Sequence, residues 1–426
     1  MTDSSAGSHA ALLLTPEGWA FLASLPPYDP GEALALGRSL REQGHSPALV
    51  AAGLTQQRLR ARAQSKFGPF ASSMLLTPDG LEQATRLEVA AHHAARYAAA
   101  GAQRVADLGC GIGGDAMALA GLDLPVLAVE RDEATAALAT VNLMHFPHAE
   151  VRCADALEVD MEAAGIDAVF ADPARRAAGR RLTDPEDWSP ALSSILALRE
   201  RVPALGVKVA PGIDHAALPD DAHVQWVSVA GEVVEAAIWC GPLAPEGPGR
   251  SALVLGAGAS AHTLADPSVD DPSAPPEQLE PIASPQDLGP LIHEPDGAAI
   301  RAGLVPHLAR GMDAQPVGPR IAYLTGDAPP PDHLAPFVRS WRITEVLPLR
   351  LKGLRSRVRE RGIGRLEIHK RGVDVSPDAL RASLKPRGEA AETWILTRLG
   401  RGAKGAVLVV EPDQADDPRA LTDDDQ

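Results

Sequence analysis

Apolar positions at helical spacing fill the beginning of the chain. Between residues 31 and 66, apolar residues recur at helix-like spacing: Leu34, Leu36 and Leu40, and then Leu49, Val50, Leu54 and Leu59. Leu36 and Leu40, like Val50 and Leu54, are four residues apart, as on one face of a helix. We therefore expect a helical N-terminal module over residues 1–75. Another helix is predicted from Thr77, a good N-cap followed by proline at the first helical position, to about residue 100.

The pattern changes after residue 103 to short apolar runs of strand length, separated by helical segments. Such runs cover residues 105–108, 126–130, 151–153, 167–172 and 206–209. This alternation predicts an α/β fold, a doubly wound and mostly parallel sheet over residues 76–262. Two further apolar stretches, 224–229 and 233–239, flank Gly231 and predict an antiparallel hairpin that closes the sheet.

The last third of the chain has smaller elements. Residues 263–290 are rich in proline, serine and acids, and we interpret them as a linker. Residues 291–426 are predicted to form a small α+β domain with helices at 298–308, 349–361 and from Ser376, and strands at 340–346, 366–370, 393–399 and 406–410.

Candidate chemistry is concentrated in Arg104–Asp115, where a short strand leads through a glycine-rich turn into a helix. Asp107 ends the strand, and Gly109, Gly111 and Gly113 follow. Glycine allows the backbone to turn tightly and to approach a ligand, and the next helix presents unpaired N–H groups to that turn. This arrangement predicts a nucleotide-type cofactor site, although an α/β glycine turn without a cofactor is the alternative.

The sequence from Gly109 to Gly114 also matches Gly-x-Gly-x-x-Gly, the dinucleotide-binding fingerprint, with Glu130 placed to hold a ribose. Two features argue against a dinucleotide. Asp107 would suit an ammonium group and would repel a pyrophosphate. Further acids, Asp155 and Asp172, follow later strands, and strand ends in such a sheet converge on one cleft.

This series of motifs resembles the class I S-adenosylmethionine-dependent methyltransferases, which have a Rossmann-like fold. The resemblance implies that Asp107 and the glycine turn hold the methionine part of S-adenosylmethionine, that Glu130 binds the ribose, and that Asp155 and Ala156 flank the adenine. Asn142 also fits the family pattern. The implied cofactor contacts are Asp107, Gly109, Gly111, Gly113, Asp115, Glu130, Arg131, Asp155 and Ala156.

In that family Asp172-Pro173 would face the methyl acceptor, so Asp172, Pro173 and Arg175 are the candidate catalytic residues. Members that methylate exocyclic amines of bases carry a second proline and an aromatic residue here, and this chain has Ala174 and Arg175 instead. The guanidinium of Arg175 or the ring of Trp188 could replace the missing stacking. The neighbouring loop arginines, Arg176, Arg180 and Arg181, suit a phosphate-bearing substrate, although a solubilising loop is the alternative.

Charge is distributed unevenly. The net charge is −16, but residues 339–404 hold 17 Lys/Arg against 7 Asp/Glu, a local net of +10, so the remainder carries −26. The layout of this region and Lys370-Arg371-Gly372 resemble the THUMP-like domain of some largely uncharacterised bacterial methyltransferases. That resemblance implies RNA binding, with Arg355 and Arg357 as candidate contacts; docking of the acidic remainder on this segment is the alternative.

Composition excludes several classes. No apolar run approaches the ~20 residues of a membrane span. The N-terminus lacks signal-peptide features, and three scattered cysteines favour neither a disulfide framework nor a metal site. We expect a cytoplasmic enzyme that methylates a base of transfer or ribosomal RNA. A small-molecule or protein methyltransferase and a catalytically inactive RNA-binding protein are the rivals; the oligomeric state stays open.

Overall fold

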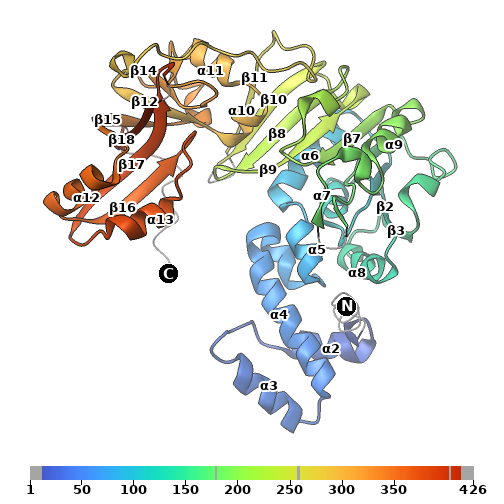
Figure 1. Ribbon diagram of the computed structural model, residues 1–426. Helices are drawn as coiled ribbons and strands as arrows, with labels where there is room; N and C mark the ends of the chain where they lie inside the picture. Colours follow the sequence, from blue (N-terminus) through green and yellow to red (C-terminus); the bar gives the residue numbers. More distant parts are fainter. Residues whose placement is uncertain (1–11, 178–179, 257–259, 403, 414–426) are drawn as a thin grey trace. The chain divides into compact units, whose positions relative to one another are not determined.

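A computed structural model describes residues 12–177, 180–256, 260–402 and 404–413 (Figure 1). The chain divides into two compact units. One comprises the chain up to Val209 together with Ala237–Glu246, and the other comprises Ala210–Ala236 together with the chain from Gly247 onward.

The first unit begins with helices, as the leucine spacing predicts: α2 (Pro16–Ser24), α3 (Ala33–Glu42) and α4 (Pro47–Phe67), followed by the 3₁₀ turn η1 (Gly68–Ser72). Thr15 and Ser46 cap α2 and α4, because each side chain accepts a backbone N–H of the first turn. Phe21, Leu40 and Val50 are buried together between these helices. The prediction of a helical N-terminal segment is confirmed.

The single helix predicted from Thr77 to residue 100 is wrong. The structure has two helices, α5 (Pro78–Gln83) and α6 (Leu87–Ala99). Ala84 and Arg86 are extended between them. The ammonium of Lys66 donates hydrogen bonds to the carbonyls of Leu81, Glu82 and Ala84, where α5 ends. This break leaves Thr85 in a short extended connection, from which its side chain reaches the interior.

A parallel sheet forms the core of the first unit, with strand order β3-β2-β1-β4-β7. The strands are β1 (Val105–Leu108), β2 (Val126–Glu130), β3 (Ala149–Cys153), β4 (Ala168–Ala171) and β7 (Ala204–Val209). The intervening helical elements are α7 (Gly114–Gly121), α8 (Glu133–Leu143), η2 (Ala156–Glu158), η3 (Pro185–Asp187), α9 (Leu192–Leu196) and η4 (Ala197–Glu200). The predicted doubly wound sheet is confirmed. Cys240 donates its N–H to Leu205, so the chain after β9 (Glu232–Trp239) returns beside β7.

The second unit contains β8 (His223–Val229), which pairs in parallel with β10 (Gly249–Leu255), and β11 (Ala261–Ala265), which pairs antiparallel with β10. Ala230 and Gly231 join β8 to β9, and both have positive φ (49° and 84°). Two consecutive positive φ angles are typical of the tight type I′ hairpin turn, and β8 and β9 are neighbours in the sheet, so the predicted hairpin is confirmed. The expectation that it closes the sheet is wrong, because β10 and β11 follow beyond β8.

A seven-stranded sheet follows in the order β13-β14-β12-β15-β18-β17-β16. Its strands are β12 (Leu291–Pro295), β13 (Gln315–Pro316), β14 (Leu324–Gly326), β15 (Val338–Pro348), β16 (Ile363–Lys370), β17 (Ala390–Leu399) and β18 (Lys404–Pro412). The helices of this part are α10 (Gly297–Arg301), α11 (Val305–Gly311), α12 (Leu351–Glu360) and α13 (Pro377–Leu384). Strand alternation splits the core between two faces: Trp394 packs with Leu354 and Leu380, and Ile395 packs with Trp341.

Two details of this region differ from the sequence interpretation. The helix predicted at 298–308 is divided into α10 and α11 by Gly303, whose φ of 72° interrupts the helix. The acid-rich stretch before β12 is held to α11, because Arg310 pairs with Asp266 (3.0 Å) and Glu277 (2.6 Å). Among the described residues, no helix has the length and apolar character needed to cross a bilayer.

Candidate functional site

The glycine turn after β1 is built against the end of β4. Gly109, Gly111 and Gly113 have φ values of 82°, 55° and 88°, a left-handed conformation that favours glycine. A Cβ at Gly109 would lie 2.8 Å from the carbonyl oxygen of Asp172, so a side chain there would displace the neighbouring strand end. The turn therefore needs glycine both for its dihedral angles and for its packing.

Asp107 is buried at the floor of this turn. It is 1% exposed, and neither carboxylate oxygen has a well-formed hydrogen bond from a described residue. Burial raises the pKa of Asp107 well above its ordinary value, and the charges of Asp115 and Asp172 raise it further; the backbone amide of Ala116 offsets part of the rise. A buried acid without a strong partner is costly unless a ligand supplies one, so Asp107 fits a cationic group such as an ammonium.

Two polar side chains hold the turn in place. Glu130, at the end of β2, accepts hydrogen bonds from the amides of Gly111 (3.1 Å) and Asp132 (2.9 Å). Asn142 of α8 accepts the amide of Leu75 (2.7 Å) and donates to the carbonyl of Ile112 (2.9 Å). Glu130 thus joins the first two strand ends, and Asn142 joins the turn to the segment before α5.

Three predicted cofactor residues and the candidate catalytic residue Asp172 lie in the order of the strands. Asp155, Glu130, Asp107 and Asp172 follow or end β3, β2, β1 and β4, four neighbouring parallel strands. Carboxyl ends of parallel strands share one edge, so these four acids line one edge of the sheet. Asp155 also caps η2 by accepting the amide of Leu157 (2.9 Å), and Ala156 begins that turn. Arg131 donates to the hydroxyl of Ser189 (2.8 Å).

A buried network crosses the same edge. The ammonium of Lys208 donates to Asp172 Oδ2 and to Thr85 Oγ1, both at 2.8 Å. Thr85 donates to Asp115 Oδ2 (2.6 Å), and His93 Nδ1 lies 3.0 Å from Asp115 Oδ1.

Asp115 is predicted from the sequence to contact the cofactor, whereas in the structure its carboxylate is hydrogen-bonded within this network. Burial alone would raise the pKa of Asp115, but the hydrogen bond and charge of His93, with Lys208 and Thr85, bring it below its ordinary value. Sequence reasoning missed Lys208, although it interrupts an otherwise apolar strand. His93 is buried and lies within hydrogen-bonding distance of Asp115.

The segment after β4 carries the candidate acceptor residues. The Asp172 side chain is 24% exposed; Pro173 is buried and Arg175 is partly buried. Ala174 and Ser189 pair through both backbone hydrogen bonds and close the loop between them. Trp188 is 4% exposed, with its indole N–H 3.4 Å from the carbonyl of Leu182, so its ring is packed inside this loop.

The loop arginines form a small hairpin, in which β5 (Arg176–Ala177) pairs with β6 (Arg180–Arg181). The backbones of Arg176, Arg180 and Arg181 are placed by this pairing, and their side chains lie outside the described part of the structure.

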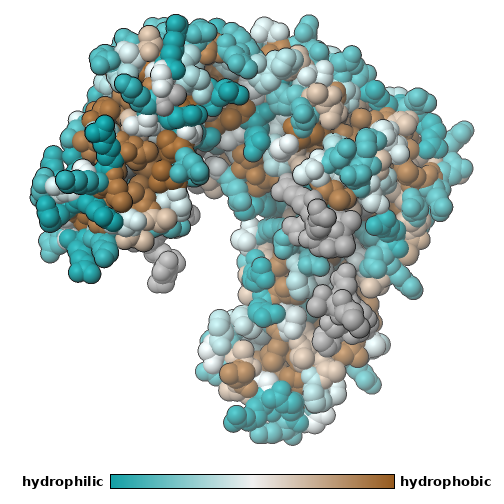
Figure 2. Space-filling model, viewed as in Figure 1, coloured by the Kyte–Doolittle hydropathy of each residue, from teal (hydrophilic) through white to brown (hydrophobic). Residues whose placement is uncertain are grey.

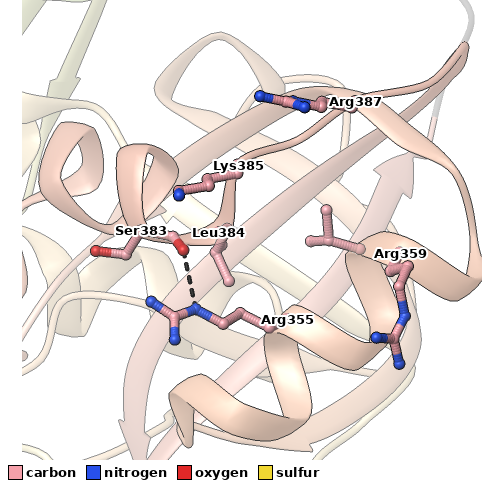
Figure 3. Close-up of a pocket in the computed structure, with 7 residues that line it drawn as sticks. Arg355, Arg359, Ser383, Leu384, Lys385 and Arg387 are labelled. Carbon is pink, nitrogen blue, oxygen red and sulfur yellow. Dashed lines mark hydrogen bonds between the residues drawn. The ribbon is translucent and has the colours of Figure 1, made fainter.

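A cationic pocket of about 490 Å³ lies between α12 and the end of α13 with the residues that follow it (Figure 3). It is lined by Arg355, Val358, Arg359, Ser383, Leu384, Lys385 and Arg387, and no acid is among these residues. The Nε of Arg355 donates to the carbonyl of Ser383 (2.9 Å), which fixes the plane of its guanidinium. Figure 2 shows hydrophilic side chains along the outer edge of this part of the chain, where α12 lies, beside a hydrophobic area.

Arg357, on the same helix, is placed differently. Its guanidinium pairs with Glu345 (2.6 Å) and Glu392 (3.0 Å), and its side chain is 12% exposed. The structure therefore places Arg355 in the cationic pocket and Arg357 in internal ion pairs. Across the described residues, no group of three His, Cys, Asp or Glu side chains is arranged to hold a metal ion.

Comparisons with known proteins agree with this architecture. Residues 338–412 match a family model described as THUMP domain-like, and residues 8–63 match a domain of unknown function. An S-adenosylmethionine-dependent methyltransferase of Mycobacterium tuberculosis, found in strains CDC 1551 and H37Rv, is 34% identical over 355 residues, which cover 81% of this chain and 92% of the relative. A crystal structure from Porphyromonas gingivalis W83, assigned as a methyltransferase, has a TM-score of 0.67 at 19% identity, covering 91% of this chain and all of that one, and shows a similar fold.

Proposed function

The chain belongs to the S-adenosylmethionine-dependent methyltransferases, and we propose that it methylates a nitrogen of a base in transfer or ribosomal RNA. The single observation that carries the RNA proposal is the acid-free cationic pocket formed by Arg355, Arg359, Lys385 and Arg387. It lies within a THUMP domain-like segment of otherwise acidic protein. Cations without acidic partners repel one another, and a polyanion relieves that repulsion.

The residues at the sheet edge fit the cofactor. Asp107 would pair with its ammonium, because this buried carboxylate has no strong partner among the described residues. Glu130 would bind the ribose hydroxyls, and Asp155 with Ala156 would flank the adenine. Gly109 and Gly111 leave room for close approach. When bound, S-adenosylmethionine supplies an activated methyl group on its sulfonium.

Asp172 is the proposed acceptor-binding residue. Its Oδ2 is bonded to Lys208, and no described residue donates to Oδ1. Oδ1 can therefore accept a hydrogen bond from an amine of the base and orient the nitrogen lone pair. Such positioning is the main contribution a protein makes to an in-line methyl transfer. Arg175, three residues along, would contact the base face or a phosphate.

RNA binding is tested by salt titration of the intact protein. Affinity for transfer RNA should fall steeply with salt, by a log–log slope of about −0.7 to −0.9 for each phosphate contact. Replacing Arg359 and Arg387 by Gln should lower that slope by about two. Arg365→Gln removes an exposed arginine outside the pocket and is the matched control. Equal slopes in the double variant and the control would refute the pocket's role.

The modification itself is tested in cells. Mass spectrometry of nucleosides from transfer and ribosomal RNA should show one methylated base absent from a strain lacking this gene. The wild-type gene should restore it, and Asp172→Asn should not. An unchanged nucleoside profile, together with tight binding of S-adenosylhomocysteine by calorimetry, would favour a small-molecule or protein substrate. An unchanged nucleoside profile without binding of S-adenosylhomocysteine would favour an inactive RNA-binding protein.

A further inference from the structure

Lys208 is the one member of the buried network that touches the proposed acceptor residue. It lies on β7, where Val207 pairs with Ala171, so Lys208 is level with Asp172 on the neighbouring strand. Its side chain is 5% exposed, and its ammonium is 2.8 Å from Asp172 Oδ2. We propose that Lys208 is a positioning residue for methyl transfer: it holds Asp172 ionised and directs the second carboxylate oxygen toward the acceptor.

The charges around Asp172 make this role necessary. Burial raises the pKa of Asp172 above its ordinary value, and the charge of Asp115 on α7 raises it further. Asp107 on β1 is a third acid at this edge, and the charge of Asp172 raises its pKa. The positive charge of Lys208 lowers the pKa of Asp172 most, and that of Arg175 on the following loop lowers it next. Without Lys208, three carboxyl groups would share a buried edge with His93 and one partly buried arginine, and the pKa of Asp172 would rise further.

The rest of the network fixes where the ammonium lies. Thr85 accepts a hydrogen bond from Lys208, and its hydroxyl donates one to Asp115, which also contacts His93. All of these bonds are 2.6–3.0 Å long, and Thr85, His93 and Asp115 are each less than 10% exposed. Because Asp115 lies on the helix that begins at the glycine turn, the network ties the acceptor carboxylate to the cofactor-binding turn.

The ionisation of Asp172 also decides what it can do with an amine. An ionised carboxylate with one oxygen held by Lys208 accepts a hydrogen bond from the substrate N–H at the other oxygen. A protonated carboxyl would donate to the nitrogen lone pair and would block attack on the methyl group. The proposal therefore rests on the proposed role of Asp172, and it predicts a measurable proton affinity that needs no RNA.

The test is a carbon-13 NMR titration of protein labelled at the Asp side-chain carboxyl, with the Asp172 signal assigned by its loss in Asp172→Asn. Lys208→Met keeps the length of the side chain and removes the charge. It should raise the pKa of Asp172 further, because an adjacent opposite charge is lost. Lys208→Arg should restore most of the wild-type value, and Arg175→Met should produce a smaller rise.

Two further readouts separate positioning from folding. Calorimetry should still show binding of S-adenosylhomocysteine by Lys208→Met, which establishes that the cofactor-binding turn is folded in this variant. If that variant does not fold, Thr85→Val, which removes one hydrogen bond to the ammonium, should raise the Asp172 pKa in the same direction by less. An Asp172 pKa equal to wild type in folded Lys208→Met would overturn the proposal. A raised pKa without any RNA methylation by the wild-type protein would instead overturn the proposed function alone.

Discussion

Replacing Asp107 by Asn should have opposite effects on stability and on cofactor binding. The substitution keeps the shape of the side chain and removes an ionisable group that is 1% exposed and poorly hydrogen-bonded. Burial and two nearby acids raise the folded-state pKa of Asp107 above 3.8, its ordinary value. The protonated carboxyl therefore favours the folded state. This stabilisation is complete below about pH 4 and is lost as the pH rises through the folded-state pKa. Asn is neutral throughout and has no such loss.

Two results are expected for Asp107→Asn. The unliganded variant should melt at or above the wild-type temperature near pH 7, with a difference that shrinks toward pH 4. Binding of S-adenosylhomocysteine should weaken, because a charge-assisted hydrogen bond to the ammonium contributes about 1.5–3 kcal/mol. That loss corresponds to a roughly ten- to 150-fold larger Kd.

Thermal unfolding across pH 4–8 and isothermal calorimetry measure these two effects. Glu162→Gln removes an exposed acid of the same unit and is the control for a change in net charge. Unchanged affinity in Asp107→Asn would refute the assignment of the ammonium to this carboxylate. A lower melting temperature at pH 7 would refute the argument that the unliganded site leaves Asp107 without a strong partner.

Four other substitutions test separate parts of the structure. Glu130→Gln should weaken binding of S-adenosylhomocysteine in calorimetry and also cost about 1 kcal/mol of stability, since Glu130 holds the amides of Gly111 and Asp132; an unchanged Kd would contradict its ribose role. Asp172→Asn should abolish methylation while the Kd for S-adenosylhomocysteine stays near wild type, the behaviour of a group used in the transition state. Arg357→Met should lower the free energy of unfolding in urea by about 1.5–3 kcal/mol, because it leaves Glu345 and Glu392 without their ion pair. Arg359→Gln should leave stability unchanged and weaken transfer RNA binding, and the reverse pattern would contradict both placements.

The strand-end acids could be predicted from sequence because the signal is local. Asp107, Glu130 and Asp172 each close a short apolar run, and a parallel sheet brings such ends to one edge. The glycine turn is equally local, since its positive φ angles are encoded by Gly109, Gly111 and Gly113.

The Lys208 network could not be predicted in the same way. It joins Thr85, Asp115, Asp172 and Lys208, which are distant in sequence and come from a helix connection, a helix and two strands. A lone lysine in an apolar strand indicates that something buried must pair with it. Only the strand register identifies the partner as Asp172.

Side-chain direction also limited the interpretation of basic residues. Arg355 and Arg357 both belong to a cationic helix, and the sequence assigns them alike to a substrate. The acids that engage Arg357, Glu345 and Glu392, are on β15 and β17, so the difference between the two arginines depends on tertiary packing. Trp188 is a similar case, because the pairing of Ala174 with Ser189 folds its loop back and buries the ring.

The most direct measurement is methyl transfer by the purified protein. Wild-type protein, S-adenosylmethionine labelled in the methyl group and RNA from a strain lacking the gene would be incubated together, and the RNA digested to nucleosides for mass spectrometry. We predict label on a single base nitrogen with wild-type protein and none with Asp172→Asn. RNA that stays unlabelled, from a preparation that binds S-adenosylhomocysteine with wild-type stoichiometry, would contradict the account.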